Sequence, residues 1–280
     1  MSELTWNRYG KSRVRLVKLR RAHDPHEIVD VTIDVQLEGA FEAVYVDGDN
    51  ASCLATDTMK NTVYALARQD SIEHIETFAS RLANHFVAQP AVARARISAV
   101  EHPWDRVSVD GKGHPHAFVQ AGGEQRTAVV TAYAGTTEVV AGIANLVVLK
   151  TTDSAFSGFP RDEYTTLPDT EDRILATSVT ASWKYRAGTT DYAARDRIRR
   201  ALIETFAAHP SRSVQHTLYA MADAALGACT DAEEITLTLP NRHHLLVDLT
   251  PFGLDNPNEI FVATDQPYGV IEATVARTRD

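Results

Sequence analysis

Hydrophobic and polar residues alternate along several short stretches of the chain. From Val29 to Leu37 every second residue is Val, Ile or Leu, and Asp, Thr or Gln stand between them. A period of two predicts a strand with one buried face and one face in water. Residues 13–19 alternate in the same way. The polar segment between the two stretches predicts an antiparallel hairpin.

Two later stretches have the spacing of helices. The first, ATDTMKNTVYALARQ, is expected to form a helix that begins near Thr58 and is capped by Thr56 or Asp57. In the second, apolar residues recur every three or four positions, and they are Ile72, Ile75, Phe78, Leu82 and Phe86. Extended segments follow at 93–101 and 116–122. The predicted order is strand, strand, helix, helix, strand, strand.

The second half of the chain repeats this order of elements. After strands at 125–135 and 138–150, the pattern predicts a strand at 176–187, helices at 191–209 and 213–228, and strands at 233–240 and 242–249. An order that recurs indicates an internal structural duplication. Strands gathered together with helices on one face predict an α+β fold. We place the boundary near Gly135 to Glu138, which gives domains 1–136 and 137–280.

Composition limits the kind of protein this is. The 280 residues are 44% apolar and 23% charged, and no apolar run reaches the roughly 18 residues that a membrane span requires. We therefore expect a soluble protein that does not bind membranes. The net charge of −9 argues against nucleic acid as a partner, because phosphate binding needs Lys and Arg concentrated on one face. An anionic substrate would have to be held by local cations.

The two ends and the cysteines predict a cytoplasmic protein. The first residues, MSELTWNRYGKSRVRL, lack the continuous apolar core of a signal peptide. Cys53 and Cys229 have no CxxC spacing for metal or redox chemistry, and two thiols in a long chain favour a reducing compartment. The last residues, VARTRD, contain no Ser-Lys-Leu signal, so we expect no peroxisomal address.

The most unusual stretch runs from Leu149 to Ile174. It is rich in Thr, Asp, Gly and Pro and too irregular for a helix or strand, yet it carries Phe156, Phe159 and Arg173. We interpret it as an ordered functional loop rather than a surface loop whose aromatic residues fold back onto the domain. The run LVVLKTTDSAFSGF, followed by RDEYTTL and DRIL, resembles the signature of the urate oxidase (uricase) family.

Separate blocks along nearly the whole chain carry the same resemblance. They are YGKSRVRLVK, ATDTMKNTVYA, SVQHTLYAM, LPNRHHLLVDL, PFGLDNPNEIF and PYGVIEAT. The resemblance implies two tandem tunnelling-fold (T-fold) domains, whose antiparallel sheets close into a barrel on oligomerisation. It also implies a cofactor-free oxidoreductase, which oxidises urate with O2 and water to 5-hydroxyisourate and hydrogen peroxide.

The resemblance assigns catalysis to Lys11, Thr56 and His243. A lysine in an enclosed, partly apolar cleft is neutral for part of the time and can then accept a proton. A threonine hydroxyl donates and accepts at once, so it can relay that proton. An imidazole titrates near neutral pH and can extend the relay. His244 is adjacent and is expected to point the other way along the strand, in a structural role.

Seven residues are assigned to substrate binding by the resemblance: Thr56, Asp57, Phe156, Arg173, Val214, Gln215 and Asn241. An aromatic face holds a flat purine, and a guanidinium supplies two parallel donors to an anionic ring. Lysine lacks that fork. Asp57 and Val214 would contribute backbone groups, and the amide of Gln215 would pair with the purine edge. Asn241 is assigned to the place above the ring where O2, and later water, binds.

Two histidine groupings invite a metal-site interpretation, His23 to His26 and His114 to His116. Neither has a carboxylate or a third ligand at a recognisable spacing. The sequence also contains no GxGxxG or GxxxxGK[ST] motif for a nucleotide cofactor. We therefore expect no metal and no cofactor.

The resemblance also implies an assembly, a homotetramer made of two dimers with active sites at subunit interfaces. Lys11 and Thr56 would come from one chain, and the substrate-binding residues of the second half from another. Two alternatives stay open: another cofactor-free T-fold enzyme that acts on a pterin or a different purine, and a purine-binding protein without turnover. The expected residue types at all catalytic positions disfavour the binding protein.

Overall fold

The computed structural model describes residues 2–22, 24–69, 71–264 and 266–278, and the chain divides into two compact units. The first unit comprises Met1–Gly142 and Lys184–Ala193, and the second comprises Ile143–Trp183 and Ala194–Asp280. Strand β7 (Thr136–Lys150) begins in the first unit and ends in the second. This division reflects compactness and not the repeat of elements, so the boundary between residues 136 and 137 stays a prediction.

The first unit is built on an antiparallel sheet with the strand order β1-β2-β3-β6. These strands are β1 (Tyr9–Arg20), β2 (Glu27–Gly39), β3 (Val92–Glu101) and β6 (Gln125–Tyr133). The alternation along β2 buries Val31, Ile33, Val35 and Leu37 completely. The predicted hairpin of the first two strands is confirmed. A separate hairpin joins β4 (Trp104–Val109) to β5 (Lys112–Gln120), and β4 was not predicted.

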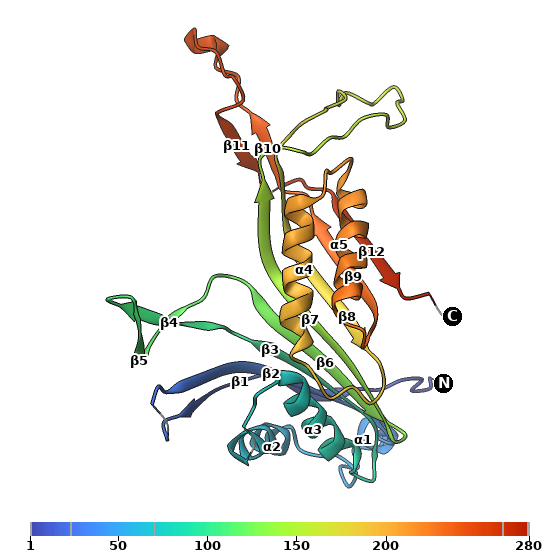
Figure 1. The fold of residues 1–280 in the computed structure, drawn as a ribbon. Coiled ribbons are helices and arrows are strands. Elements are labelled where there is room, and N and C mark those ends of the chain that lie inside the picture. The colour runs from blue at the N-terminus through green and yellow to red at the C-terminus, as the bar shows by residue number, and fades with distance from the viewer. Residues whose placement is uncertain (1, 23, 70, 265, 279–280) are drawn as a thin grey trace. The chain divides into compact units, whose positions relative to one another are not determined.

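Helices α2 (Thr56–Gln69) and α3 (Ile75–Val87) lie against this sheet (Figure 1). Helix α2 packs against β1, and α3 packs against β3 and β6. The predicted spacing of α3 is confirmed for Ile75, Phe78, Leu82 and Phe86, which are buried, but Ile72 lies before the helix begins and has a φ of 50°. A short helix, α1 (Glu42–Val46), precedes them and was not predicted.

The predicted start of α2 is wrong by two residues. The helix begins at Thr56, because the Met59 N–H already donates to the carbonyl oxygen of Ala55, at 3.2 Å. Thr56 and Asp57 are therefore its first residues and not its cap. The sequence pattern could not fix this start, because both residue types also suit the first turn of a helix.

In the second unit the strands follow the order β7-β8-β9-β12. The new elements are β8 (Leu175–Tyr185), α4 (Ala194–Ala208), α5 (Val214–Ala228), β9 (Ala232–Pro240) and β12 (Val270–Ala276). Helix α4 packs on α5, and α5 packs on β9 and β12. Apart from α1, the predicted order of strand, strand, helix, helix, strand is confirmed in both halves of the chain.

The last predicted strand is shorter than expected and belongs to a hairpin. Strand β10 (His243–Leu246) pairs with β11 (Phe261–Thr264), and a 3-10 helix, η1 (Thr250–Phe252), lies between them along the chain. Neither β11 nor β12 was predicted, because half of the side chains of β11 and most of those of β12 are exposed, and no period-two pattern marks either strand. None of the described helices is long and apolar enough to cross a membrane.

Candidate functional site

Lys11 lies near the start of β1, beside a β-bulge. Lys11 faces Val35 on β2 whereas Val14 faces Ile33, so β1 carries one residue more than its partner over this interval. Arg13, inside the bulge, has a φ of 57°. Bulges re-aim the side chains around them and are frequent next to active sites. The bulge therefore sets the direction in which the half-buried Lys11 leaves the strand.

Gly10, directly before Lys11, lets β1 approach β2 closely. A Cβ at this position would lie 1.9 Å from the carbonyl oxygen of Val35. No side chain fits at that distance, because real Cβ contacts are not shorter than 3.0 Å. The glycine in the YGK block is therefore required by packing, whatever Lys11 does.

Tyr9 joins the start of β1 to the loop before α2. Its hydroxyl oxygen accepts a hydrogen bond from the Leu54 N–H at 2.8 Å, and its ring packs edge-on against Phe41 with centroids 4.8 Å apart. Burial, with a smaller contribution from Cys53, raises the pKa of Tyr9 to about 12, so the phenol stays neutral. Because Leu54 is two residues before Thr56, this bond holds the start of α2 near the start of β1.

Asp57 lies close to Lys11, in the first turn of α2. Its carboxylate accepts hydrogen bonds from Lys60 Nζ at 2.5 Å and Asn61 Nδ2 at 2.9 Å. The bond from Lys60 is the main cause that holds the pKa of Asp57 below its usual range, and the charge of Lys11 adds to it. The carboxylate is thus engaged within the helix. The N–H groups of Thr56 and Asp57 have no partner inside the helix, since they belong to its first turn.

The segment between β7 and β8 is an ordered loop of the second unit, as predicted (Figure 1). Phe156 and Thr170 exchange two backbone hydrogen bonds, of 2.7 and 3.0 Å. Phe159 stacks on Phe156 with ring centroids 4.8 Å apart and an angle of 11° between the planes. These contacts bring the two sides of the loop together and hold Phe156 in a fixed, half-buried position.

Arg173 ends this loop and lies over Phe156. Its guanidinium carbon is 5.3 Å from the centroid of the Phe156 ring. Burial lowers the pKa of Arg173 from its usual value. Its buried Nε has no hydrogen-bond partner in the part of the chain that the structure describes. A buried donor without a partner is costly, so this N–H is available for an acceptor on a ligand.

Val214 and Gln215 are the first residues of α5. Ser213 caps the helix, because its hydroxyl oxygen accepts a hydrogen bond from the His216 N–H at 3.1 Å. Val214 is buried and Gln215 is exposed. The loop is attached to this helix start through Ser211, whose carbonyl oxygen accepts a hydrogen bond from the Ala155 N–H at 2.7 Å. Phe156 follows directly after this attachment.

Asn241 lies between β9 and β10, in the predicted turn, and His243 is the first residue of β10. The Asn241 N–H donates to the carbonyl oxygen of Gly269 at 2.8 Å, and Asn241 forms an antiparallel bridge with Thr177 on β8. Asn241 and His243 are both half-buried. The bridge joins Asn241 to the strand that begins just after Arg173.

The structure thus gathers the predicted residues into two sets. The first unit holds Lys11, Thr56 and Asp57, and the second unit holds Phe156, Arg173, Val214, Gln215, Asn241 and His243. The first set supplies an amine and a hydroxyl, which are groups that can accept and pass on a proton. The second set supplies a ring face beneath a guanidinium and two side-chain amides, which are groups that can bind a flat anion.

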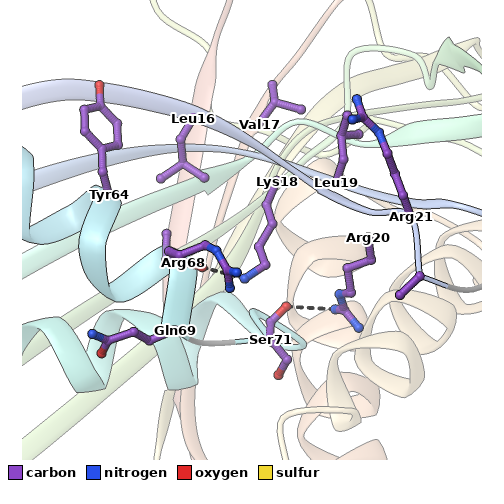
Figure 2. Close-up of a pocket in the computed structure, with 12 residues that line it drawn as sticks. Leu16, Val17, Lys18, Leu19, Arg20, Arg21, Tyr64, Arg68, Gln69 and Ser71 are labelled. Atoms are coloured by element: carbon purple, nitrogen blue, oxygen red, sulfur yellow. Dashed lines mark hydrogen bonds between the residues drawn. The ribbon is translucent and has the colours of Figure 1, made fainter.

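A groove of about 770 Å³ lies between the second half of β1 and the end of α2 (Figure 2). Lys18, Arg20, Arg21 and Arg68 give it a positive charge. The Lys18 ammonium donates to the carbonyl oxygen of Ala67 at 2.5 Å, near the C-terminal end of α2, where cations are stabilised by the helix. Lys11, Thr56 and Asp57 are not among the residues that line the groove.

Three histidines that the sequence analysis considered as metal ligands lie near one another. The ring centroid of His116 is 5.9 Å from that of His26 and 4.5 Å from that of His114. His23 lies outside the described residues. Over the described ranges, no group of three His, Cys, Asp or Glu side chains is arranged to hold a metal ion.

Comparison with known sequences identifies the family. The family model named Uricase matches residues 7–131 and 139–272. The chain belongs to the uricase family. The uricase of Arthrobacter globiformis is 48% identical to it over 273 residues, which cover 97% of this chain and 89% of that protein. The uricase of Aspergillus flavus is 36% identical over 296 residues, which cover 99% of this chain and 98% of that protein.

Solved structures establish the fold. The crystal structure of the Arthrobacter globiformis uricase matches with a TM-score of 0.94 and 46% identity, over 100% of this chain and 97% of that one. A uricase structure from Bacillus fastidious has the same fold, with a TM-score of 0.85 and 24% identity, over 98% of this chain and 94% of that one. The predicted α+β T-fold with antiparallel sheets is confirmed.

Three residues that shape the site were not singled out in the sequence analysis. Tyr9 holds the start of α2, Ser211 holds the loop against α5, and Asp172 closes the base of the loop. Asp172 has a sequence signal, because it directly precedes Arg173 in the DRIL run. Tyr9 and Ser211 have none, because their partners lie far away along the chain.

Proposed function

We propose that this uricase family member is a urate oxidase, an oxidoreductase that converts urate, O2 and water to 5-hydroxyisourate and hydrogen peroxide. The observation that carries the proposal is the half-buried Arg173 over Phe156, whose Nε has no hydrogen-bond partner among the described residues. A flat anion satisfies both groups, because the ring face takes its plane and the guanidinium takes its charge. Family membership narrows the flat anion to urate.

The proposed mechanism begins with proton transfer from bound urate. The Lys11 amine, in its neutral form, accepts the proton through the Thr56 hydroxyl, and His243 extends this relay. Arg173 and Gln215 hold the resulting electron-rich anion in place, and its electrons pass to O2 near Asn241. The reduced O2 takes up a proton and bonds to a purine carbon as a peroxide. Water then replaces this peroxide, so that hydrogen peroxide leaves and a hydroxyl group stays on the ring. The anion itself supplies the reducing electrons, so the proposal includes no metal or organic cofactor.

The proposed assembly is a homotetramer made of two dimers, in which antiparallel sheets of different chains close into a barrel. Two features support it. The set that contains Lys11 and Thr56 lies in the first unit of the chain, and the clamp, which consists of Phe156 and Arg173, lies in the second. Strands β1 and β12 are also edge strands, and the unpaired backbone groups of an edge strand can pair with a second copy of the chain. The cytoplasm stays the predicted compartment, on the sequence grounds given above.

The test of the function uses purified protein from which metals have been stripped. Urate is added in air-saturated buffer, and the loss of its ultraviolet absorbance is followed together with peroxide. We expect one peroxide for each urate consumed. Turnover of a pterin without turnover of urate would mean a different T-fold enzyme, and tight urate binding without peroxide would mean a binding protein. Either result overturns the proposal.

Arg173→Lys tests the clamp. An ammonium cannot present two parallel donors in the plane of the ring. We expect the dissociation constant for urate, measured without O2 so that no turnover occurs, to rise about 10- to 100-fold, from about 1.5–3 kcal/mol for a hydrogen bond to a charged group. Arg161→Lys is the matched control, because Arg161 lies over Phe159 in the same loop, 4.9 Å from its ring centroid. Unchanged urate binding in Arg173→Lys would remove Arg173 from the clamp.

A further inference from the structure

The loop that carries Phe156 and Arg173 is closed at its base by one carboxylate. Asp172 accepts a hydrogen bond from the Thr152 hydroxyl at 2.7 Å and another from the Ser154 N–H at 3.3 Å. Thr152 and Ser154 stand at the start of the loop, and Asp172 stands at its end. The carboxylate therefore joins the two ends of the loop directly beside Arg173.

The same base is tied to the start of α5. Ser154 is buried and forms a parallel bridge with Ser211. The Ser211 N–H donates to the carbonyl oxygen of Asp153 at 2.9 Å, so the backbone on both sides of Ser154 is bonded to the turn before α5. Asp172 thus binds the segment 152–154. This segment leads along the chain to Phe156, and it is hydrogen-bonded to the turn before α5, the helix that carries Gln215.

Hydrogen bonds at the base favour the ionised carboxylate of Asp172. The hydrogen bond from Thr152 is the main cause that holds the pKa of Asp172 below its usual range, and backbone N–H groups add to it. Lys150 is near by, since the charges of Asp153 and Asp172 both act on its ammonium. Lys150 Nζ itself donates to the carbonyl oxygen of His209 at 2.6 Å. At neutral pH Asp172 is therefore ionised, and its carboxylate accepts the hydrogen bonds from Thr152 and Ser154.

We propose that Asp172 is a positioning residue, which fixes Arg173 over Phe156 by closing the base of the loop. This inference rests on the proposed function and adds to it a residue that does not touch the substrate. The physical reason is geometric: Arg173 follows Asp172 directly, and Phe156 follows Ser154 by two residues. The positions of Arg173 and Phe156 therefore both depend on the carboxylate of Asp172. A shift of about 1 Å in such a clamp is enough to cost about 100-fold in activity.

The experiment compares Asp172→Ala with Asp162→Ala. Asp162 is the matched control, because it accepts bonds from the Thr165 hydroxyl at 2.8 Å and the Tyr164 N–H at 3.0 Å within the same loop but away from its base. Urate binding is measured without O2, at a temperature where both variants are fully folded by circular dichroism. We expect Asp172→Ala to weaken binding about tenfold and Asp162→Ala to leave it within about twofold. Asp172→Asn, which keeps an acceptor oxygen, is expected to recover part of the loss.

A double-mutant cycle separates positioning from a general loss of structure. If Asp172 acts through Arg173, Asp172→Ala combined with Arg173→Lys binds urate about as weakly as Arg173→Lys alone. Losses that multiply would show an independent structural effect and overturn the proposal. Equal binding by wild type and Asp172→Ala would overturn it as well. A wild-type chain that neither binds nor oxidises urate would instead refute the proposed function.

Thr152→Val provides a second route if Asp172→Ala does not fold. Thr152 is exposed, so the substitution removes its hydroxyl donor without disturbing the core. We expect Thr152→Val to weaken urate binding less than Asp172→Ala does. In a chain that already carries Arg173→Lys, we expect Thr152→Val to cause no further loss. Unchanged binding in a folded Thr152→Val protein would show that the bond to Asp172 does not place the clamp.

Discussion

Lys11→Met is expected to lower kcat by about 10²- to 10⁴-fold, the usual contribution of a general acid or base. Methionine has a similar length and apolar stem but cannot accept a proton. The backbone around Lys11 is fixed by the bulge and by the close approach of Gly10 to Val35, so the strand is expected to keep its course. Steady-state kinetics with urate, together with circular dichroism to verify folding, provide the measurement.

Thr56→Val and the double variant show whether the two residues act as one relay. A relay that needs both groups fails when either is lost, so the double variant is expected to be about as slow as the slower single variant. Lys18→Met is the control on the same strand, where the ammonium binds the carbonyl oxygen of Ala67 and not the site. Losses that multiply in the double variant would show that Lys11 and Thr56 act separately.

Mixing two inactive chains is expected to restore activity, if each site takes residues from two chains. A Thr56→Ala chain lacks the first set, and an Arg173→Ala chain lacks the second. After dissociation and random reassembly of equal amounts, half of the dimers are mixed and each has one of its two sites intact. About one quarter of wild-type activity is therefore expected, by the symmetry of a dimer with two equivalent sites.

The control for this experiment is a mixture that is never dissociated, which should stay as inactive as its parents. Formation of mixed oligomers is verified independently, with a different tag on each chain. Verified mixed oligomers without activity would show that each chain carries a complete site of its own, and the shared-site assembly would be wrong. Sedimentation of the wild-type chain tests the tetramer separately.

The elements with a regular burial pattern could be predicted from the sequence. In β2 and α3 the spacing of apolar residues follows directly from which face is buried, because side chains repeat every two residues in a strand and about every 3.6 in a helix. The separate motif blocks likewise indicate the uricase family from the sequence alone. Strands β11 and β12 were not predicted, because half of the side chains of β11 and most of those of β12 are exposed, so neither sequence alternates between apolar and polar residues.

The placement of the candidate residues was decided by contacts between distant parts of the chain. The bulge beside Lys11 depends on its register with β2, and the position of Thr56 depends on the bond from Leu54 to Tyr9. The sequence supplied Phe156 and Arg173 as residue types suited to a flat anion. Only the closed loop base set one over the other and left the Arg173 Nε buried without a partner among the described residues. Local periodicity determined the elements with a regular burial pattern, whereas hydrogen bonds across long sequence separations, which no local pattern encodes, determined how the candidate residues are placed.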